Sequence, residues 1–106
     1  MVDTPRAAVS GLDLVVTSGP ILKHPTPAIE AGWLAPGAFA SAVDFDSYFQ
    51  GAALREMDVI ATDDLAQMDY YRTVCYFQET PRAHAELGEL VCGQKPGRTS
   101  AHQRTL

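Results

Sequence analysis

The fold class is indicated most clearly by Leu12-Asp13-Leu14-Val15-Val16-Thr17-Ser18. It is short, mostly apolar and β-branched, and Gly19-Pro20 follows it directly. A short apolar run bounded by turn residues is typical of a strand in a parallel sheet, where helices cover both faces. The stretch therefore predicts a buried parallel strand over residues 12–18.

Two further stretches outside this one also predict strands. They are Ala38-Phe39-Ala40-Ser41-Ala42-Val43 and Asp58-Val59-Ile60-Ala61-Thr62. Helix signals lie between and around the strands: capping residues, proline at the first helical position, and apolar residues three or four apart. These signals predict helices over residues 4–10, 26–33 and 51–57, a helix that opens at residues 62–64, and a last helix from Thr80 to Gly93.

Alternation of strands with helices predicts an α/β fold with a parallel sheet of about three strands and flanking helices. The chain has 106 residues, which is the length of one small domain. We place that domain at residues 1–93 and expect residues 94–106 to form a polar, loose C-terminal tail. Three strands are fewer than the five or six of a doubly wound sheet. The sheet is therefore expected to keep an open edge.

Composition excludes several classes of partner. The formal net charge is −5, so the chain is not expected to bind nucleic acid or anionic membrane surfaces. No apolar stretch approaches the roughly 20 residues of a membrane span. The two cysteines, Cys75 and Cys92, suit a reducing cytosol better than a disulfide scaffold. The sequence predicts a cytoplasmic protein without a metal site.

Four segments resemble one known family in a single register. Residues 11–18 are similar to that family's "aDivvTaT" strand, and residues 33–46 to its "wlkpGahinavGaD" segment. Residues 59–64 resemble its "vvvDd" strand end, and residues 85–100 its "eLGeliaGkkpGRts" segment. The ordered set resembles the ornithine cyclodeaminase/mu-crystallin family, in the second half of its nucleotide-binding domain.

This resemblance implies a partial Rossmann-like three-layer sandwich that binds NAD or NADP in the parent family. Members transfer hydride between the nicotinamide and a carbon that bears nitrogen, and the cofactor supplies the difficult chemistry. The resemblance implies a fragment of an NAD(P)-dependent oxidoreductase or cyclodeaminase that acts on an amino acid or a cyclic imine. Such a fragment is expected to be inactive alone and to form a homo-oligomer.

The resemblance also assigns candidate site residues. Asp46 matches the position of the family's catalytic aspartate, where a carboxylate can shuttle a proton. Thr17 and Ser18 end the first strand, at the edge where such folds hold the cofactor. Val43 ends the second strand and is expected to line the nicotinamide side.

The sequence departs from the family pattern near Asp46. Asp44-Phe45 replaces a glycine-rich step, and Gln50 stands where the family commonly has lysine. The sequence has no G-x-G-x-x-G, the turn that brings backbone N–H groups to a pyrophosphate. Cofactor binding by this chain alone is therefore not expected, and the substrate stays open.

A non-catalytic alternative also stays open. The chain can be an interaction or structural protein derived from this fold, self-associating through an exposed strand edge or through the aromatic run of residues 70–77. Asp46 would then be an ordinary loop or capping residue, and Thr17 and Ser18 would simply satisfy a strand end.

Overall fold

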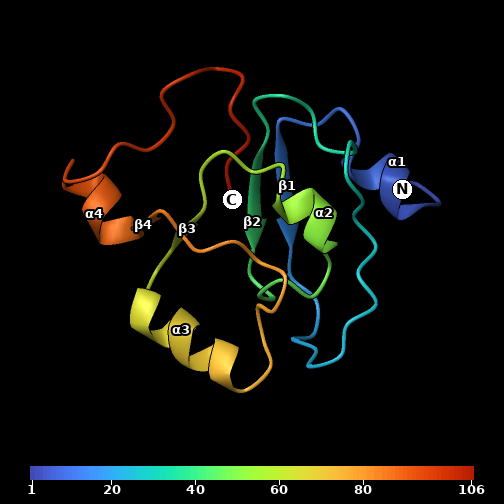
Figure 1. Cartoon of the computed structure of the whole chain (residues 1–106). Coiled ribbons are helices and arrows are strands. Elements are labelled where there is room, and N and C mark those ends of the chain that lie inside the picture. The colour runs from blue at the N-terminus through green and yellow to red at the C-terminus, as the bar shows by residue number, and fades with distance from the viewer.

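The computed structural model describes residues 1–106 and shows a small α/β fold (Figure 1). The predicted α/β class is confirmed, although no helix separates the first two strands. The elements in chain order are α1 (Pro5–Val9), β1 (Leu14–Thr17), β2 (Phe39–Ala42), α2 (Gly51–Leu54), β3 (Ala61–Thr62), α3 (Leu65–Thr73), β4 (Ala85–Glu86) and α4 (Leu87–Val91).

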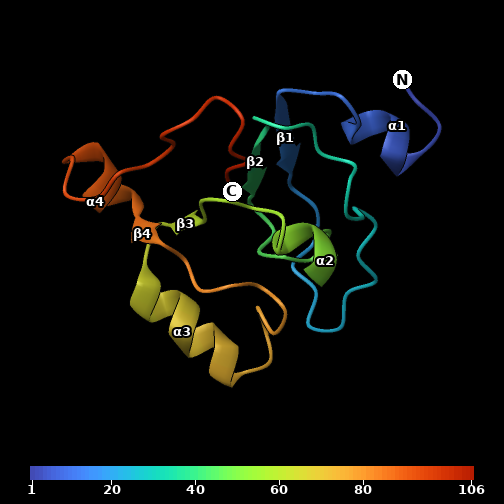
Figure 2. The ribbon, with the colours of Figure 1, turned by 45° about the horizontal axis from the view of Figure 1, so that its top comes forward.

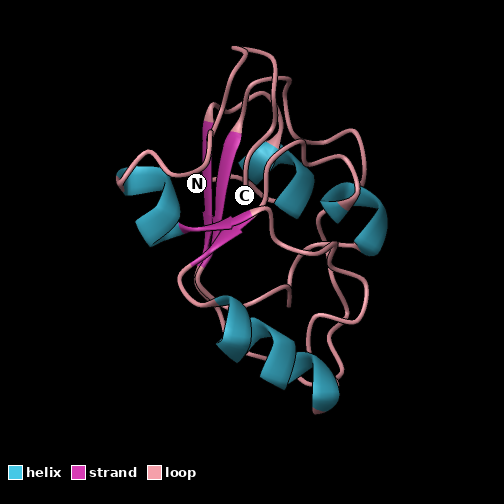
Figure 3. Ribbon diagram, turned by 60° about the vertical axis from the view of Figure 1, so that its left-hand side comes forward, coloured by secondary structure: helices cyan, strands magenta, loops and turns pink.

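The strands form two parallel pairs. In the first pair β1 lies beside β2, with Leu14 opposite Phe39. In the second pair β3 lies beside β4, with Ala61 opposite Ala85. Every pairing is parallel, as the sequence predicts. The strands lie at the centre of the molecule and the helices lie around them (Figure 3).

The C-terminal residues join the two pairs. Thr105 forms parallel bridges to Phe39 on one side and to Val59 on the other. Figures 1 and 2 both show the C-terminus between β2 and β3. The spatial order is therefore β1, β2, residues 104–106, β3, β4, and the last segment of the sequence lies in the middle of the sheet.

The prediction of a loose tail is wrong for these last residues. The Thr105 N–H donates to the Ala38 carbonyl at 3.0 Å, and the Leu106 N–H donates to the Val59 carbonyl at 2.9 Å. The edges of β2 and β3 would otherwise leave unpaired backbone groups. A polar segment therefore becomes ordered because its backbone, not its side chains, fills the gap in the sheet.

One face of the sheet carries the main core. Val15 is 4% exposed and Ala40 is 1% exposed, and α2 covers them with Ala53 and Leu54. Figure 1 shows α2 packed in front of β1 and β2. The full core cluster consists of Val9, Val15, Ile29, Leu34, Ala38, Ala40, Phe49, Ala53 and Leu54.

The opposite face of the β1–β2 pair is open. Side chains alternate between the two faces of a strand, and the residues on this second face are Leu14, Val16 and Phe39. They are 58%, 57% and 44% exposed, respectively. The expectation that the first strand is buried on both faces is therefore wrong within these 106 residues.

The predicted helix caps are confirmed at two helices. The Thr4 hydroxyl accepts the Ala7 N–H at 3.1 Å, and Pro5 begins α1. The Asp64 carboxylate accepts the Gln67 N–H at 2.8 Å at the start of α3. The structure contains no helix that is long and apolar enough to cross a membrane.

Two predicted helices are wrong in whole or in part. Residues 26–33 form no helix, because the Ile29 N–H is bonded to the Tyr48 carbonyl and Ile29 bridges to Phe49. The predicted helix from Thr80 to Gly93 is confined to α4. Ala85 and Glu86, within the predicted helix, pair with β3 instead, so tertiary pairing overrides the helical spacing of the apolar residues.

Candidate functional site

The carboxyl ends of β1 and β2 are tied together by a buried carboxylate. The Thr17 hydroxyl donates to Asp44 Oδ1 at 2.7 Å, and the Gly19 N–H donates to Asp44 Oδ2 at 2.9 Å. Asp44 is only 1% exposed. The candidate cofactor residue Thr17 therefore uses its hydroxyl to fix the loop after β1.

Asp46 lies two residues farther along and faces the other way along the sheet edge. Its Oδ2 accepts a hydrogen bond from the Thr80 hydroxyl at 2.8 Å. Thr80 is buried, at 6% exposure, whereas Asp46 itself is half-buried. The carboxylate is thus held on one side and accessible on the other, which is the geometry that a proton-transfer group requires.

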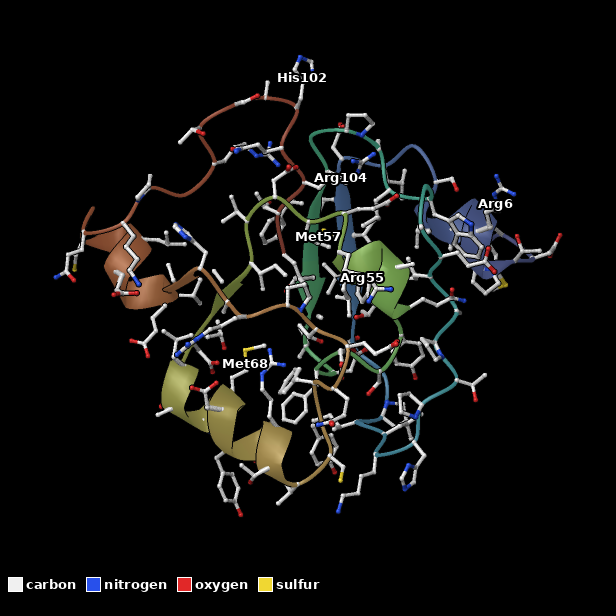
Figure 4. The ribbon with its side chains drawn as sticks, viewed as in Figure 1. Arg6, Arg55, Met57, Met68, His102 and Arg104 are labelled. Atoms are coloured by element: carbon white, nitrogen blue, oxygen red, sulfur yellow. The ribbon has the colours of Figure 1, made fainter.

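Asp46 lies beside a hollow of about 750 Å³. The hollow lies over the open face of β2 and β3, and α3, α4 and the C-terminal segment bound it. Met68 points from α3 toward this space (Figure 4). Apolar lining residues include Phe39, Val43, Ile60, Met68, Phe77, Leu87 and Leu90, and polar ones include Asp46, Asp63, Thr80 and Arg98.

The structure brings together two of the four predicted site residues. Val43 and Asp46 both line the hollow. Thr17 and Ser18 do not line it, although Thr17 is linked to the same region through Asp44. Val43 is 64% exposed, so its side chain is available for contact with a ligand.

A smaller hollow of about 200 Å³ lies on the other side of Asp46. Asp46 and Phe77 line both hollows, and Lys23 and Glu79 line only the smaller one. A carboxylate between an apolar space and a more polar one can contact groups of different chemistry on its two sides.

Sequence reasoning missed two polar residues of this site. Asp44 is visible as an acid at a position where the resembled family has a glycine-rich step, but nothing in the sequence shows that it bonds to Thr17. Thr80 lies 34 residues from Asp46 in the sequence, and its Thr80-Pro81 pair is typical of a helix start. Only the tertiary structure brings its hydroxyl to the carboxylate.

Glu89 on α4 is the group whose acidity is altered most clearly. The Glu86 backbone N–H donates to its carboxylate at 2.9 Å, and Lys95 lies 3.0 Å from it. These two contacts, the backbone donor first, lower the pKa of Glu89 below its ordinary value.

The residues present fit one part of a nicotinamide dinucleotide. An apolar hollow that runs along β2 and β3 and reaches their carboxyl ends suits a planar ring. The pyrophosphate does not fit. The N-terminus of α3 is already capped by Asp64, and Glu86 Oε1 accepts the Leu65 N–H at 2.9 Å. Carboxylates at these positions repel a phosphate.

The parallel strand pairs with helices around them define a domain of the Rossmann-like class. The profile of the ornithine cyclodeaminase/mu-crystallin family matches residues 1–106. The chain belongs to this family, as the motifs quoted above predict.

Two relatives in sequence come from rhizobia. A protein named as a dehydrogenase from Rhizobium meliloti is 31% identical over 111 residues, which cover 96% of this chain and 32% of the relative. A protein named as a cyclodeaminase from Sinorhizobium fredii is 33% identical over 113 residues, which cover 98% and 33%. The chain spans about a third of the length of these relatives.

Two solved structures share the fold. One is the Δ1-pyrroline-2-carboxylate reductase of Thermococcus litoralis in complex with NADH and L-proline, with a TM-score of 0.68 and 22% identity. The other is an archaeal alanine dehydrogenase dimer with bound NAD, with a TM-score of 0.71 and 23% identity. Each match covers 99% of this chain and 34% of the neighbour. The predicted Rossmann-like fold is confirmed.

Proposed function

We propose that this chain is the part of an NAD(P)-dependent oxidoreductase or cyclodeaminase that carries the proton-transfer carboxylate and one wall of the nicotinamide site. Its substrate class is an amino acid or a cyclic imine. The observation that supports this proposal is that Val43 and Asp46 line one apolar hollow, at the strand ends where such folds hold their cofactor.

Within this proposal the 106 residues do two things. Asp46 accepts or donates a proton at the substrate nitrogen or at the group that attacks it, because its carboxylate is fixed by Thr80 and open to the hollow. The apolar lining, including Val43, excludes water from the reacting centre. Hydride transfer is the chemistry that the bound nicotinamide supplies.

Within this proposal the chain alone is expected to be inactive. The N-termini of α3 and α4 carry acidic caps, which disfavour a pyrophosphate there. The phosphates must be held by residues outside these 106. The isolated chain is therefore expected to contact the nicotinamide ring weakly and to turn over no substrate.

Titration calorimetry with NADH and with NADPH tests this function. A dissociation constant below about 100 μM, about −5.5 kcal/mol, would mean that this part alone holds most of the cofactor, which the proposal denies. We expect binding in the millimolar range, with saturation transfer from the protein to the nicotinamide protons rather than to the adenine protons.

Two matched variants test whether the nicotinamide ring binds in the hollow. Val43→Glu places a charge in the wall of the hollow and should abolish saturation transfer. Val91→Glu makes the same change at a side chain that is 86% exposed and outside the hollow, and should leave the transfer unchanged. Equal effects of the two variants, or transfer to adenine protons alone, would refute the proposed ring wall.

A second candidate function rests on a different observation, the open apolar face and edge of β1. Leu14, Val16 and Phe39 are exposed on one face, and β1 is bonded to a strand only on its β2 side. Two copies can pair their β1 edges antiparallel about a two-fold axis, which covers both the edges and part of the open faces. We propose a homodimer of this kind as the alternative role.

Sedimentation equilibrium tests self-association through this face. Val16→Lys places a charge on the open face and should convert a dimer to a monomer, whereas Val2→Lys, at a side chain that is 53% exposed near the N-terminus, should not. A monomer at all concentrations up to about 1 mM, a Kd that corresponds to about −4 kcal/mol, would exclude self-association.

A further inference from the structure

The segment that orients Asp46 lies far from it in the sequence, in the loop of residues 74–81 that follows α3. This loop contacts the Asp46 region in two independent ways. It supplies the Thr80 hydroxyl to the carboxylate at 2.8 Å. It also supplies aromatic rings that pack around Phe45, the residue directly before Asp46.

Phe45 carries the backbone that aims Asp46. Its φ angle is 62°, in the left-handed region that bulky side chains rarely adopt. Its ring lies 4.7 Å from the Phe77 ring and 4.9 Å from the Tyr71 ring, centroid to centroid. A conformation of this kind persists where the surroundings over-determine it, as these rings do for Phe45.

The loop is itself held by one guanidinium group. Arg72 donates from Nη1 to the Phe77 carbonyl at 2.8 Å and from Nη2 to the Thr80 carbonyl at 2.8 Å. A third bond joins Nη2 to the Pro81 carbonyl at 3.1 Å. Lysine cannot supply this planar fork of donors. Arg72 therefore fixes Phe77 and Thr80, two of the three residues by which the loop contacts the Asp46 region.

We infer that the loop of residues 74–81 positions Asp46, with Thr80 as the positioning residue and Arg72 as the group that holds the loop in place. This inference rests on the proposed function, since it explains how the proton-transfer carboxylate is kept in one orientation. It adds a requirement: a segment 34 residues away in the sequence must fold before Asp46 can act.

The test is the side-chain rotamer of Asp46 in the isolated chain, measured by NMR from the three-bond couplings of its γ carbon. We expect one dominant χ1 rotamer in the wild type and in Thr80→Ser, which keeps the hydroxyl. Thr80→Val and Thr80→Ala lose the hydroxyl. In both, the dominant population should fall toward about one-third to one-half as the staggered wells are shared.

Two arginine variants test the second part. Arg72→Lys should increase amide hydrogen exchange at residues 77–81 by about tenfold or more. It should also lower the population of the dominant Asp46 χ1 rotamer. Arg82→Lys is the matched control, because Arg82 makes only an exposed ion pair with Asp69 at 3.8 Å. It should change neither the exchange nor the rotamer.

The result that overturns the inference is an unchanged Asp46 rotamer in Thr80→Val or Thr80→Ala, or a Thr80→Ser variant that behaves like them. If Thr80 only stabilised the fold, its substitution would lower the free energy of unfolding and leave the Asp46 rotamer unchanged. The rotamer is measured without any cofactor. A failure of nucleotide binding would therefore refute the proposed function without affecting this result. An unchanged Asp46 rotamer would refute this inference without affecting the proposed function.

Discussion

The half of the molecule built from β1, β2 and α2 is packed differently from the half built from β3, β4, α3 and α4. The first half contains a continuous cluster of nine buried apolar residues. The second half has a cluster of three, which are Ile60, Met68 and Ala83. The large hollow lies between the two halves: β2 and the residues that follow it line one side, and β3, α3 and α4 line the other.

The difference shows which interactions stabilise each half. The first half is held by apolar burial, which is non-directional and strong. The second half is held mainly by polar contacts: the C-terminal strand segment, the Arg72 bonds and the acidic helix caps. The hollow borders the half with the smaller apolar cluster, since a well-packed core leaves no space of this size.

The largest expected effect tests the strong half. Leu54 is 0% exposed inside the nine-residue cluster, so Leu54→Ala should lower the free energy of unfolding by about 2–5 kcal/mol. Urea denaturation followed by circular dichroism measures this. Val91→Ala, at a side chain that is 86% exposed, is the control and should stay within about 0.5 kcal/mol. Equal losses in the two variants would show that the nine-residue cluster is not the main core.

The next prediction separates the two halves. Thr105→Pro removes the N–H that donates to the Ala38 carbonyl, and should destabilise the chain by about 1–3 kcal/mol. Hydrogen exchange should rise first at residues 59–61, which the C-terminal segment joins to β2. Thr105→Val keeps the N–H and should leave the exchange unchanged. Uniform exchange across both halves would show that they unfold as one unit.

The sequence predicted best those elements whose signals are local, in both halves of the molecule. Residues 12–18 predicted β1 because a short run of apolar β-branched residues between turn signals is typical of a strand. The helix signals at Thr4 and Asp64 were also sufficient, since a cap and its partner lie three residues apart. Local patterns of this kind are visible in a single sequence.

The site was predicted only through resemblance, and only in part. Asp46 and Val43 were found from their place in the family motif, and both line the hollow. The partners of Asp46 and of Thr17 lie 34 and 27 residues away in the sequence. No periodicity signals a contact at that separation. The same holds for residues 104–106, whose place in the sheet depends on the gap between β2 and β3.

A smaller effect is expected at Met68, in the three-residue cluster. Met68 is 7% exposed and borders the hollow. Met68→Ala should cost about 2 kcal/mol, at the low end for such a substitution, because the open hollow lets the site relax. Urea denaturation checks this beside Leu54→Ala. A larger loss for Met68→Ala than for Leu54→Ala would reverse the comparison between the halves.

The smallest predicted effect depends on pH and lies at Glu89. The Glu86 N–H and then Lys95 lower the pKa of Glu89, so the carboxylate is favoured more in the folded chain than in the unfolded chain. Its contribution to stability is therefore present above the unfolded-state pKa of about 4.3 and is lost as the pH falls through the lower folded-state pKa. Glu89→Gln should be less stable than the wild type at pH 6, and the difference should shrink as the pH is lowered.

Glutamine at this position can still accept the Glu86 N–H, as in other capping boxes. The variant therefore isolates the charge from the cap itself. Urea denaturation at pH 6, 4.5 and 3 measures the difference, and added salt should reduce it at pH 6 because Lys95 and Glu89 are near the surface. Glu30→Gln removes a charge from an exposed loop as the control. A Glu89→Gln difference that grows toward pH 3 would contradict the assigned direction, because it would mean that folding favours the protonated form of Glu89.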